Sequence, residues 1–212
     1  MKTLMTSSRL IQLTGFALLG SFLLGGCATT NKPAAKIDYP SKARGWNGVD
    51  EVEFMQPFKL ADYARLVVAA VETNKCTLPP KDENTYAPAV AVLGQVDTIV
   101  YREVTRGLTN KLQVVAQTSN AAGDTNGLLL KMKVAEFNPG SVAARFWVGF
   151  GAGSGWVRMD GELVDMKTQK TLLKFDQRRI SSMRLDYQGM LVACSREIAE
   201  DVARLIKLSE NR

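Results

Sequence analysis

An uncharged apolar run near the amino end, Leu10 to Leu24, limits what the rest of this 212-residue chain can fold into. Lys2 and Arg9 make the start of the chain basic, and the run ends in small residues directly before Cys27. This pattern is typical of a secretory signal peptide, and the run is too short for a dependable membrane-spanning helix. We therefore expect residues 1–26 to be removed and the folded part to lie after them.

The residues around the expected cleavage point favour a lipid anchor. Leu24-Gly25-Gly26-Cys27 resembles a bacterial lipobox, which implies thioether lipidation of Cys27 by a diacylglyceryl group, cleavage before it, and acylation of the new amino end. An ordinary signal peptide followed by an incidental cysteine is the alternative. Ala28 stands where an aspartate tends to hold Gram-negative lipoproteins at the inner membrane. The resemblance therefore implies an outer-membrane anchor with the domain facing the periplasm.

The composition excludes several classes of site. The chain contains no histidine, so it lacks the commonest general acid–base and the commonest zinc ligand. Without residues 1–26, 25 basic residues stand against 21 acidic ones, a net charge of +4. These charges are interspersed rather than gathered in a patch. We therefore expect no nucleic-acid partner, and no cofactor apart from the covalent lipid.

The cysteines predict a cross-link. With Cys27 occupied by lipid, Cys76 and Cys194 remain, too few for a cysteine-rich metal site. An exported chain meets an oxidising compartment, where two remaining cysteines tend to pair. A disulfide closing so long a loop stabilises a fold by roughly 4 kcal/mol. We expect this disulfide, and two buried thiols that pack as small apolar groups are the alternative.

The chain after the signal divides into a linker and one domain. Residues 27–45 contain two prolines and few large apolar side chains, which indicates a lipidated amino end and a flexible linker. Residues 46–212 form the predicted periplasmic domain, with an irregular start over 46–60. The unbroken apolar run Leu66–Val71 predicts a strand covered on both faces.

The rest of the domain alternates between helical and strand periodicities. Apolar residues three and four apart over Tyr86–Leu112 predict one long helix, followed by a short strand, residues 113–117, parallel to the first. Two-residue alternation predicts strands over 128–134, 156–165 and 171–177, and a second long helix covers 187–208. The order β-α-β-β-β-β-α predicts a single α+β domain: a mixed, mostly antiparallel sheet of about five strands, with both helices on one side.

A run of alternate glycines is the most distinctive stretch of the mature chain. In an extended chain these glycines share one face, which lets a helix of the same domain, another subunit or lipid approach the backbone closely. A bent edge segment is the plainer alternative. A dinucleotide site is excluded, because Trp156 stands where the third glycine is needed. The suspected contact segment comprises Arg145, Gly149, Phe150, Gly151, Gly153, Gly155 and Trp156.

This stretch also carries a family resemblance. Asn138–Arg145, Val148–Ser154 and Gly161–Asp165 resemble an uncharacterised family of bacterial lipoproteins, a domain of unknown function with a PG…R…GFGAG core. The resemblance spans residues 66–182 and implies a periplasmic domain with no established activity. The chain departs from the family at Trp156, and also in its Lys-containing turn at 166–170, where a Thr-Gly-Lys type is usual.

Few residues remain that point to a reaction. Asp160 and Glu162 share a strand face and could form the carboxylate pair of a hydrolase, but the adjacent Arg158 favours cross-strand ion pairs. We therefore expect a non-catalytic interaction or accessory module that binds the membrane through its lipid and contacts an envelope protein. The alternative is an oligomeric subunit of an export or adhesion apparatus, with Gly149–Gly155 as the subunit or membrane contact.

Overall fold

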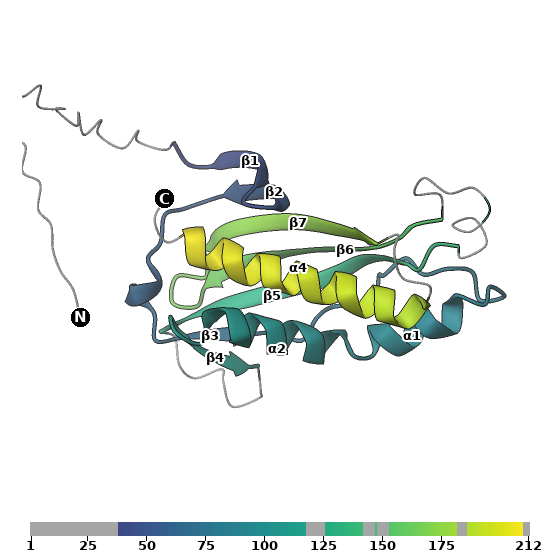
Figure 1. Ribbon diagram of the computed structural model, residues 1–212. Helices are drawn as coiled ribbons and strands as arrows, with labels where there is room; N and C mark the ends of the chain where they lie inside the picture. Colours follow the sequence, from purple (N-terminus) through teal and green to yellow (C-terminus); the bar gives the residue numbers. More distant parts are fainter. Residues whose placement is uncertain (1–37, 118–125, 142–146, 148–152, 182–185, 210–212) are drawn as a thin grey trace, which may run out of the picture. The chain divides into compact units, whose positions relative to one another are not determined.

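In the described part of the chain, a seven-stranded mixed sheet carries three α-helices, α1, α2 and α4, on one face (Figure 1). The computed structural model describes residues 38–117, 126–141, 147, 153–181 and 186–209, which belong to one compact unit from Ile37 to Arg212. The strand order is β1-β2-β7-β6-β5-β3-β4. The predicted α+β class and the mixed, mostly antiparallel sheet are confirmed. The signal peptide, Cys27 and most of the linker lie outside the described residues.

Two strands that the sequence analysis missed open the domain. β1 (Ser41–Trp46) and β2 (Val49–Phe54) form an antiparallel hairpin that pairs with β7 through β2. Asn47 and Gly48 form its turn with φ angles of 49° and 89°, which suit the two positions of a type I′ turn. The prediction of an irregular start over 46–60 was therefore wrong, and β1 begins inside the expected linker.

Parallel pairing occurs around β3 (Arg65–Val68), as the sequence predicts. This strand pairs in parallel with β4 (Gln113–Ala116) on one side and β5 (Gly127–Asn138) on the other. Leu66 and Val67 point to opposite faces and are both almost wholly buried. A short 3-10 turn, η1 (Leu60–Asp62), precedes β3.

The predicted first helix is two helices. α1 (Tyr86–Leu93) ends at Gly94, and α2 (Val96–Leu108) begins after Gln95. The apolar steps continue across this break, which is why the sequence pattern gave one helix. α2 packs against α4 (Tyr187–Ser209), and no side chain separates them at Gly107, where a Cβ would lie 2.6 Å from that of Ala203. Among the described helices, none is both long and apolar enough to cross a membrane.

The three long strands form an antiparallel meander. β5 pairs with β6 (Gly155–Asp165), which pairs with β7 (Thr171–Ser181). Alternate residues of β6, such as Met159 and Leu163, are fully buried under the helices. The residues between them face the other side of the sheet, where the charged side chains lie. A bulge between Val134 and Glu136 shifts the alternation of β5.

A buried polar network joins the hairpin, β7 and α4. Asp201 of α4 is only 4% exposed, and its carboxylate accepts hydrogen bonds from Gln177 (2.9 Å), Arg179 and Arg204. Gln177 and Arg179 also donate to the carbonyl oxygen of Gly48, at 3.1 and 2.9 Å. The network therefore holds the hairpin turn against the end of the long helix.

Candidate contact surface

The open face of the sheet, opposite the helices, carries two rows of charged side chains that run across five strands. In the first row, positive and negative side chains alternate from strand to strand. The two outer pairs are salt bridges, Lys42–Glu53 at 3.6 Å and Lys131–Glu162 at 3.2 Å. Opposite charges at neighbouring cross-strand positions stabilise a sheet. The row reads, from β1 to β5, Lys42, Glu53, Lys174, Glu162 and Lys131.

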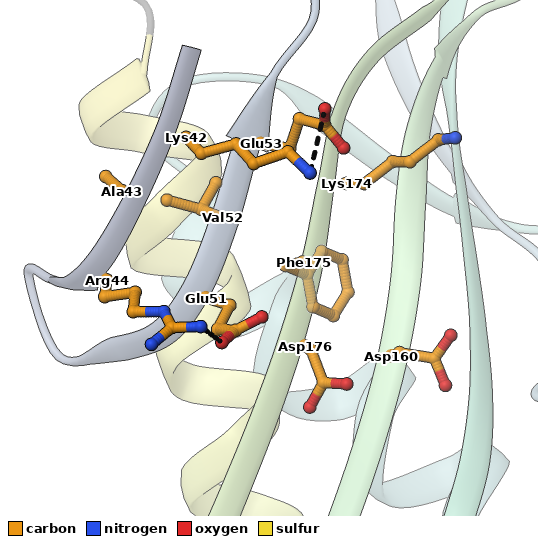
Figure 2. A pocket seen from close by; sticks show the side chains of 10 residues that line it. All are labelled: Lys42, Ala43, Arg44, Glu51, Val52, Glu53, Asp160, Lys174, Phe175 and Asp176. Atoms are coloured by element: carbon orange, nitrogen blue, oxygen red, sulfur yellow. Dashed lines mark ion pairs between the residues drawn. The ribbon is translucent and has the colours of Figure 1, made fainter.

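The second row places three acids side by side. From β1 to β5 it contains Arg44, Glu51, Asp176, Asp160 and Lys133. Arg44 pairs with Glu51 at 3.1 Å and Lys133 with Asp160 at 3.1 Å, so a cation closes each end. A hollow of about 320 Å³ lies between the two rows over β1, β2, β7 and β6 (Figure 2).

The central acid of that row is neutralised by Arg158. The Nε and Nη2 groups of Arg158 donate to the two carboxylate oxygens of Asp176 at 2.9 and 2.7 Å, and Nη1 of Arg158 donates to Glu136 at 3.4 Å. These bonds, led by that to Asp176, raise the pKa of Arg158 above its ordinary value. Across the described residues, no group of three acidic or cysteine side chains is placed to hold a metal ion.

The proposed carboxylate pair lies in this charged surface. Asp160 and Glu162 share the open face as expected, and each is paired with a lysine. Burial works to raise the pKa of Glu162, but hydrogen bonds from Thr171 and Lys131 outweigh it, and the pKa lies below its ordinary value. A general acid needs the opposite shift. The arrangement therefore favours cross-strand ion pairs, the alternative that Arg158 indicated.

The two described glycines of the suspected contact segment serve this chain's own fold. A Cβ on Gly155, the first residue of β6, would overlap the side chain of Met190 from α4. Gly153 has a φ of +70°, and its carbonyl oxygen accepts the backbone N–H of Ser141 at 2.9 Å. Of the three approaches considered, a helix of the same domain is the one seen at Gly155. Arg145, Gly149, Phe150 and Gly151 lie outside the described residues.

Trp156 anchors the end of the open face. Its indole N–H donates to Glu136 at 2.8 Å, and the guanidinium of Arg178 lies 4.6 Å from its ring centroid. Ile180 stands opposite it in the register of β7 and is 59% exposed. A hollow of about 570 Å³ adjoins these residues, also lined by Asn138. An aromatic ring fixed from two sides presents a rigid contact area.

The sequence analysis did not include three residues of this end in the contact site: Glu136, Trp147 and Ile180. Strict alternation from Lys133 places Glu136 on the core face, and only the bulge turns it to the open face. Trp147, in the connection between β5 and β6, is 81% exposed, and Ile180 is the last residue but one of β7. Among the described residues these are the two most exposed large apolar side chains. An aromatic residue in a glycine-rich connection was the available signal for Trp147.

The predicted disulfide is not formed: within the part of the chain that the structure describes, Cys76 and Cys194 are both thiols. Cys194 belongs to α4 and is buried in the core. Cys76 is half-buried beside Glu136, and burial first, then that charge, raises its pKa to about 11. Cys76 packs against the hydrophobic core, and its Sγ lies 3.5 Å from the carbonyl oxygen of Thr77. The two thiols pack separately, as the alternative described.

The sequence itself decides the family. A family model described as a domain of unknown function, DUF4410, matches residues 66–183, more than half of the chain. The chain belongs to the DUF4410 family. This confirms the resemblance drawn from the glycine-rich core. The DUF4410 match runs from β3 past the end of β7 and includes Trp156, whereas the β1–β2 hairpin and α4 lie outside it. No curated protein matches the chain.

Several solved structures are similar to this DUF4410 chain at low identity. A PelC dodecamer from Paraburkholderia phytofirmans shares 11% identity with a TM-score of 0.44, covering 72% of this chain and 96% of that one. Protein XCC0632 from Xanthomonas campestris shares 9%, with a TM-score of 0.44 and coverages of 74% and 92%. Lipoprotein GNA1162 from Neisseria meningitidis shares 12%, with a TM-score of 0.33 and coverages of 66% and 99%.

Proposed function

We propose that this chain is an outer-membrane-anchored, periplasm-facing lipoprotein that acts as a non-catalytic contact module in the cell envelope. The observation that carries this proposal is the open face of the sheet, where cations pair with all six acids of Glu51, Glu53, Glu136, Asp160, Glu162 and Asp176. The lipid on Cys27 supplies the location, and the open face supplies the surface for an envelope protein.

The chemistry of the open face supports binding rather than reaction. Asp160 and Glu162 are each paired with a lysine, and the pKa of Glu162 is lowered, so Glu162 is not set up to donate a proton near neutral pH. The chain has no histidine to act in their place. A surface of ion pairs serves recognition, because complementary charge fixes the register and the choice of partner more than it raises affinity.

The arrangement also lowers the cost of binding. Side chains already held by partners across the sheet, such as Arg158 between Asp176 and Glu136, lose less rotamer freedom when a partner docks. Tethering to a membrane further confines both proteins to a thin layer and raises their effective concentration. A contact of modest intrinsic affinity therefore suffices in the envelope.

Photo-cross-linking in whole envelopes tests the proposal. A photoreactive residue replaces Lys174, in the centre of the first charged row, and a matched one replaces Lys207, exposed on α4. We expect the probe at 174 to capture one defined envelope protein that the probe at 207 does not. Identical products from both positions, or only lipid and self-adducts from 174, would contradict the proposal.

The oligomeric alternative ranks second. This alternative depends on the alternate glycines as a subunit contact. The two described glycines contact the same chain instead: Gly153 accepts a hydrogen bond from Ser141, and Gly155 packs against Met190. Sizing of the lipidated protein in detergent separates the two functions. A monomer at micromolar concentration agrees with the contact module, and a discrete ring-sized oligomer favours the alternative.

A further inference from the structure

We infer that the sheet end that carries Trp147 and Ile180 rests on the surface of the phospholipid bilayer that holds the lipid anchor. This inference depends on the proposed anchoring through Cys27, and it names a second site of membrane contact far from that residue in the sequence. We call this region the Trp147 end and define it by Trp147, Ile180 and Arg178.

Exposed apolar side chains gather at this end of the domain. In the described part of the chain, four large apolar residues are exposed: Val90 at 42%, Trp147 at 81%, Ile180 at 59% and Leu208 at 38%. Three of them belong to elements at one end of the sheet: the β5–β6 connection, the end of β7, and α1 (Figure 1). Leu208 lies at the opposite end, in the last turn of α4. Single exposed apolar residues are ordinary, but such a gathering marks a contact site.

The residue types at the Trp147 end suit the boundary between lipid and water. A tryptophan has an apolar ring and one polar N–H, which is why tryptophan is enriched at the headgroup level of membranes. Arg178, two positions before Ile180 on β7, supplies a cation for lipid phosphates. From Gly140 to Ser154 the sequence contains one charged residue, Arg145, and no acid, and nearby Glu136 is already bound by Trp156 and Arg158, whereas Glu83 also lines the adjoining hollow. These features fit a phospholipid bilayer as the occupant.

The length of the amino-terminal segment permits this contact. β1 starts at Ser41, which pairs with Phe54 of β2, and Phe54 in turn pairs with Leu173 of β7. The chain therefore enters the sheet level with Leu173, at a distance from Ile180 along the strand direction. The seven residue-to-residue steps from Leu173 to Ile180 span about 23 Å of strand. The thirteen steps from Cys27 to Pro40 reach at most about 45 Å. The anchor can therefore stay in the bilayer while the Trp147 end touches it.

Tethering explains how so small a patch can be effective. Two apolar side chains and one cation bind a bilayer weakly on their own, and stable membrane attachment usually takes two signals. Once lipid on Cys27 holds the domain near the surface, the second contact becomes intramolecular and needs little intrinsic affinity. Its effect is to orient the domain, so that the charged open face points in a defined direction for a partner.

Quenching of tryptophan fluorescence tests the inference on the full lipidated chain. The protein is reconstituted in vesicles of phosphatidylethanolamine and phosphatidylglycerol, with either plain or brominated acyl chains. The chain has three tryptophans, and we expect bromine to quench the emission of Trp147 only, because Trp156 donates its N–H to Glu136 and carries the guanidinium of Arg178 over its ring. Trp147→Phe should abolish the bromine-dependent quenching. Trp46→Phe is the matched control and should retain it, because Trp46 packs edge-on against Phe54, 5.1 Å between ring centroids.

The outcomes separate the inference from the proposed function. Equal emission in plain and brominated vesicles, with the protein floating alongside the vesicles, overturns the inference and leaves the anchor intact. Quenching that Trp46→Phe abolishes and Trp147→Phe retains also overturns it. A chain that does not float with vesicles contradicts the proposed anchor itself. Ile180→Ser, which leaves every tryptophan in place, should reduce the quenching, and unchanged quenching in this variant counts against the inference.

Discussion

Replacing Asp201 with alanine removes the acceptor at the centre of the buried network. The carboxylate accepts from Gln177, Arg179 and Arg204, and Gln177 is fully buried, so its amide loses a partner that water cannot replace. Arg179 and Arg204 keep part of their hydration, with side chains 27% and 51% exposed. Breaking a fully buried pair costs about 3–5 kcal/mol, and this partial exposure lowers our expectation to about 2–3 kcal/mol.

The neighbouring residue provides the control. Glu200, also on α4, pairs with Arg106 of α2 and Arg196 of α4. Because Glu200 is 41% exposed, we expect Glu200→Ala to lower the stability by only about 0–1 kcal/mol. Asp201→Asn keeps the shape and one acceptor oxygen. Burial raises the pKa of Asp201 although both arginines act to lower it, so a neutral side chain is tolerated at this position. The loss of stability in Asp201→Asn should therefore lie between those of Asp201→Ala and Glu200→Ala.

Urea denaturation followed by circular dichroism measures these differences. The midpoint should fall in Asp201→Ala without a change in slope, since the surface exposed on unfolding stays the same. The free-energy loss corresponds to a fall in melting temperature of roughly 5–10 °C for a domain of this size. If Asp201→Ala and Glu200→Ala shift the midpoint equally, the network does not hold the hairpin to the helix and the reasoning fails.

The remaining predictions concern groups whose pKa the fold shifts. The pKa of Glu162 is lowered, so this carboxylate stabilises the fold above about pH 4.3 and the contribution is lost as pH falls through the folded value. Glu162→Gln should therefore flatten the loss of stability in acid, and parallel curves for variant and wild type would contradict this. Burial and then Asp165 raise the pKa of Tyr63 to about 12, so an absorbance titration should contain a last step near pH 12 that belongs to Tyr63. Tyr63→Phe should remove that last step, and its persistence would refute the assignment. The raised pKa of Cys76 predicts slow alkylation near about pH 8, and modification as fast as a free peptide thiol would refute it.

The sequence predicted the elements whose periodicity was strong and uninterrupted. Alternation over Val157, Met159 and Leu163 placed these residues on the core face, and all three are fully buried. The strand–helix–strand order likewise predicted the parallel pairing of β3 with β4. These patterns are local consequences of side-chain burial, so one sequence suffices to find them.

The missed features depend on turns and on distant contacts. Asn47-Gly48 is a strong hairpin signal, but the strands beside it alternate short apolar side chains with charged ones and resemble a linker. The break at Gly94 leaves the helical apolar steps in phase. The place of Glu136 depends on a bulge, and two partners of Asp201, Gln177 and Arg179, lie on β7. None of these follows from local periodicity.

The central claim is that an acyl anchor at Cys27 places a non-catalytic contact domain in the envelope. Mass spectrometry of the native protein, purified from membranes in detergent, tests it most directly. The account predicts a mature chain that starts at Cys27 and carries the added mass of diacylglyceryl and amide-linked acyl groups. An unacylated, water-soluble chain that starts at any other residue would contradict the account.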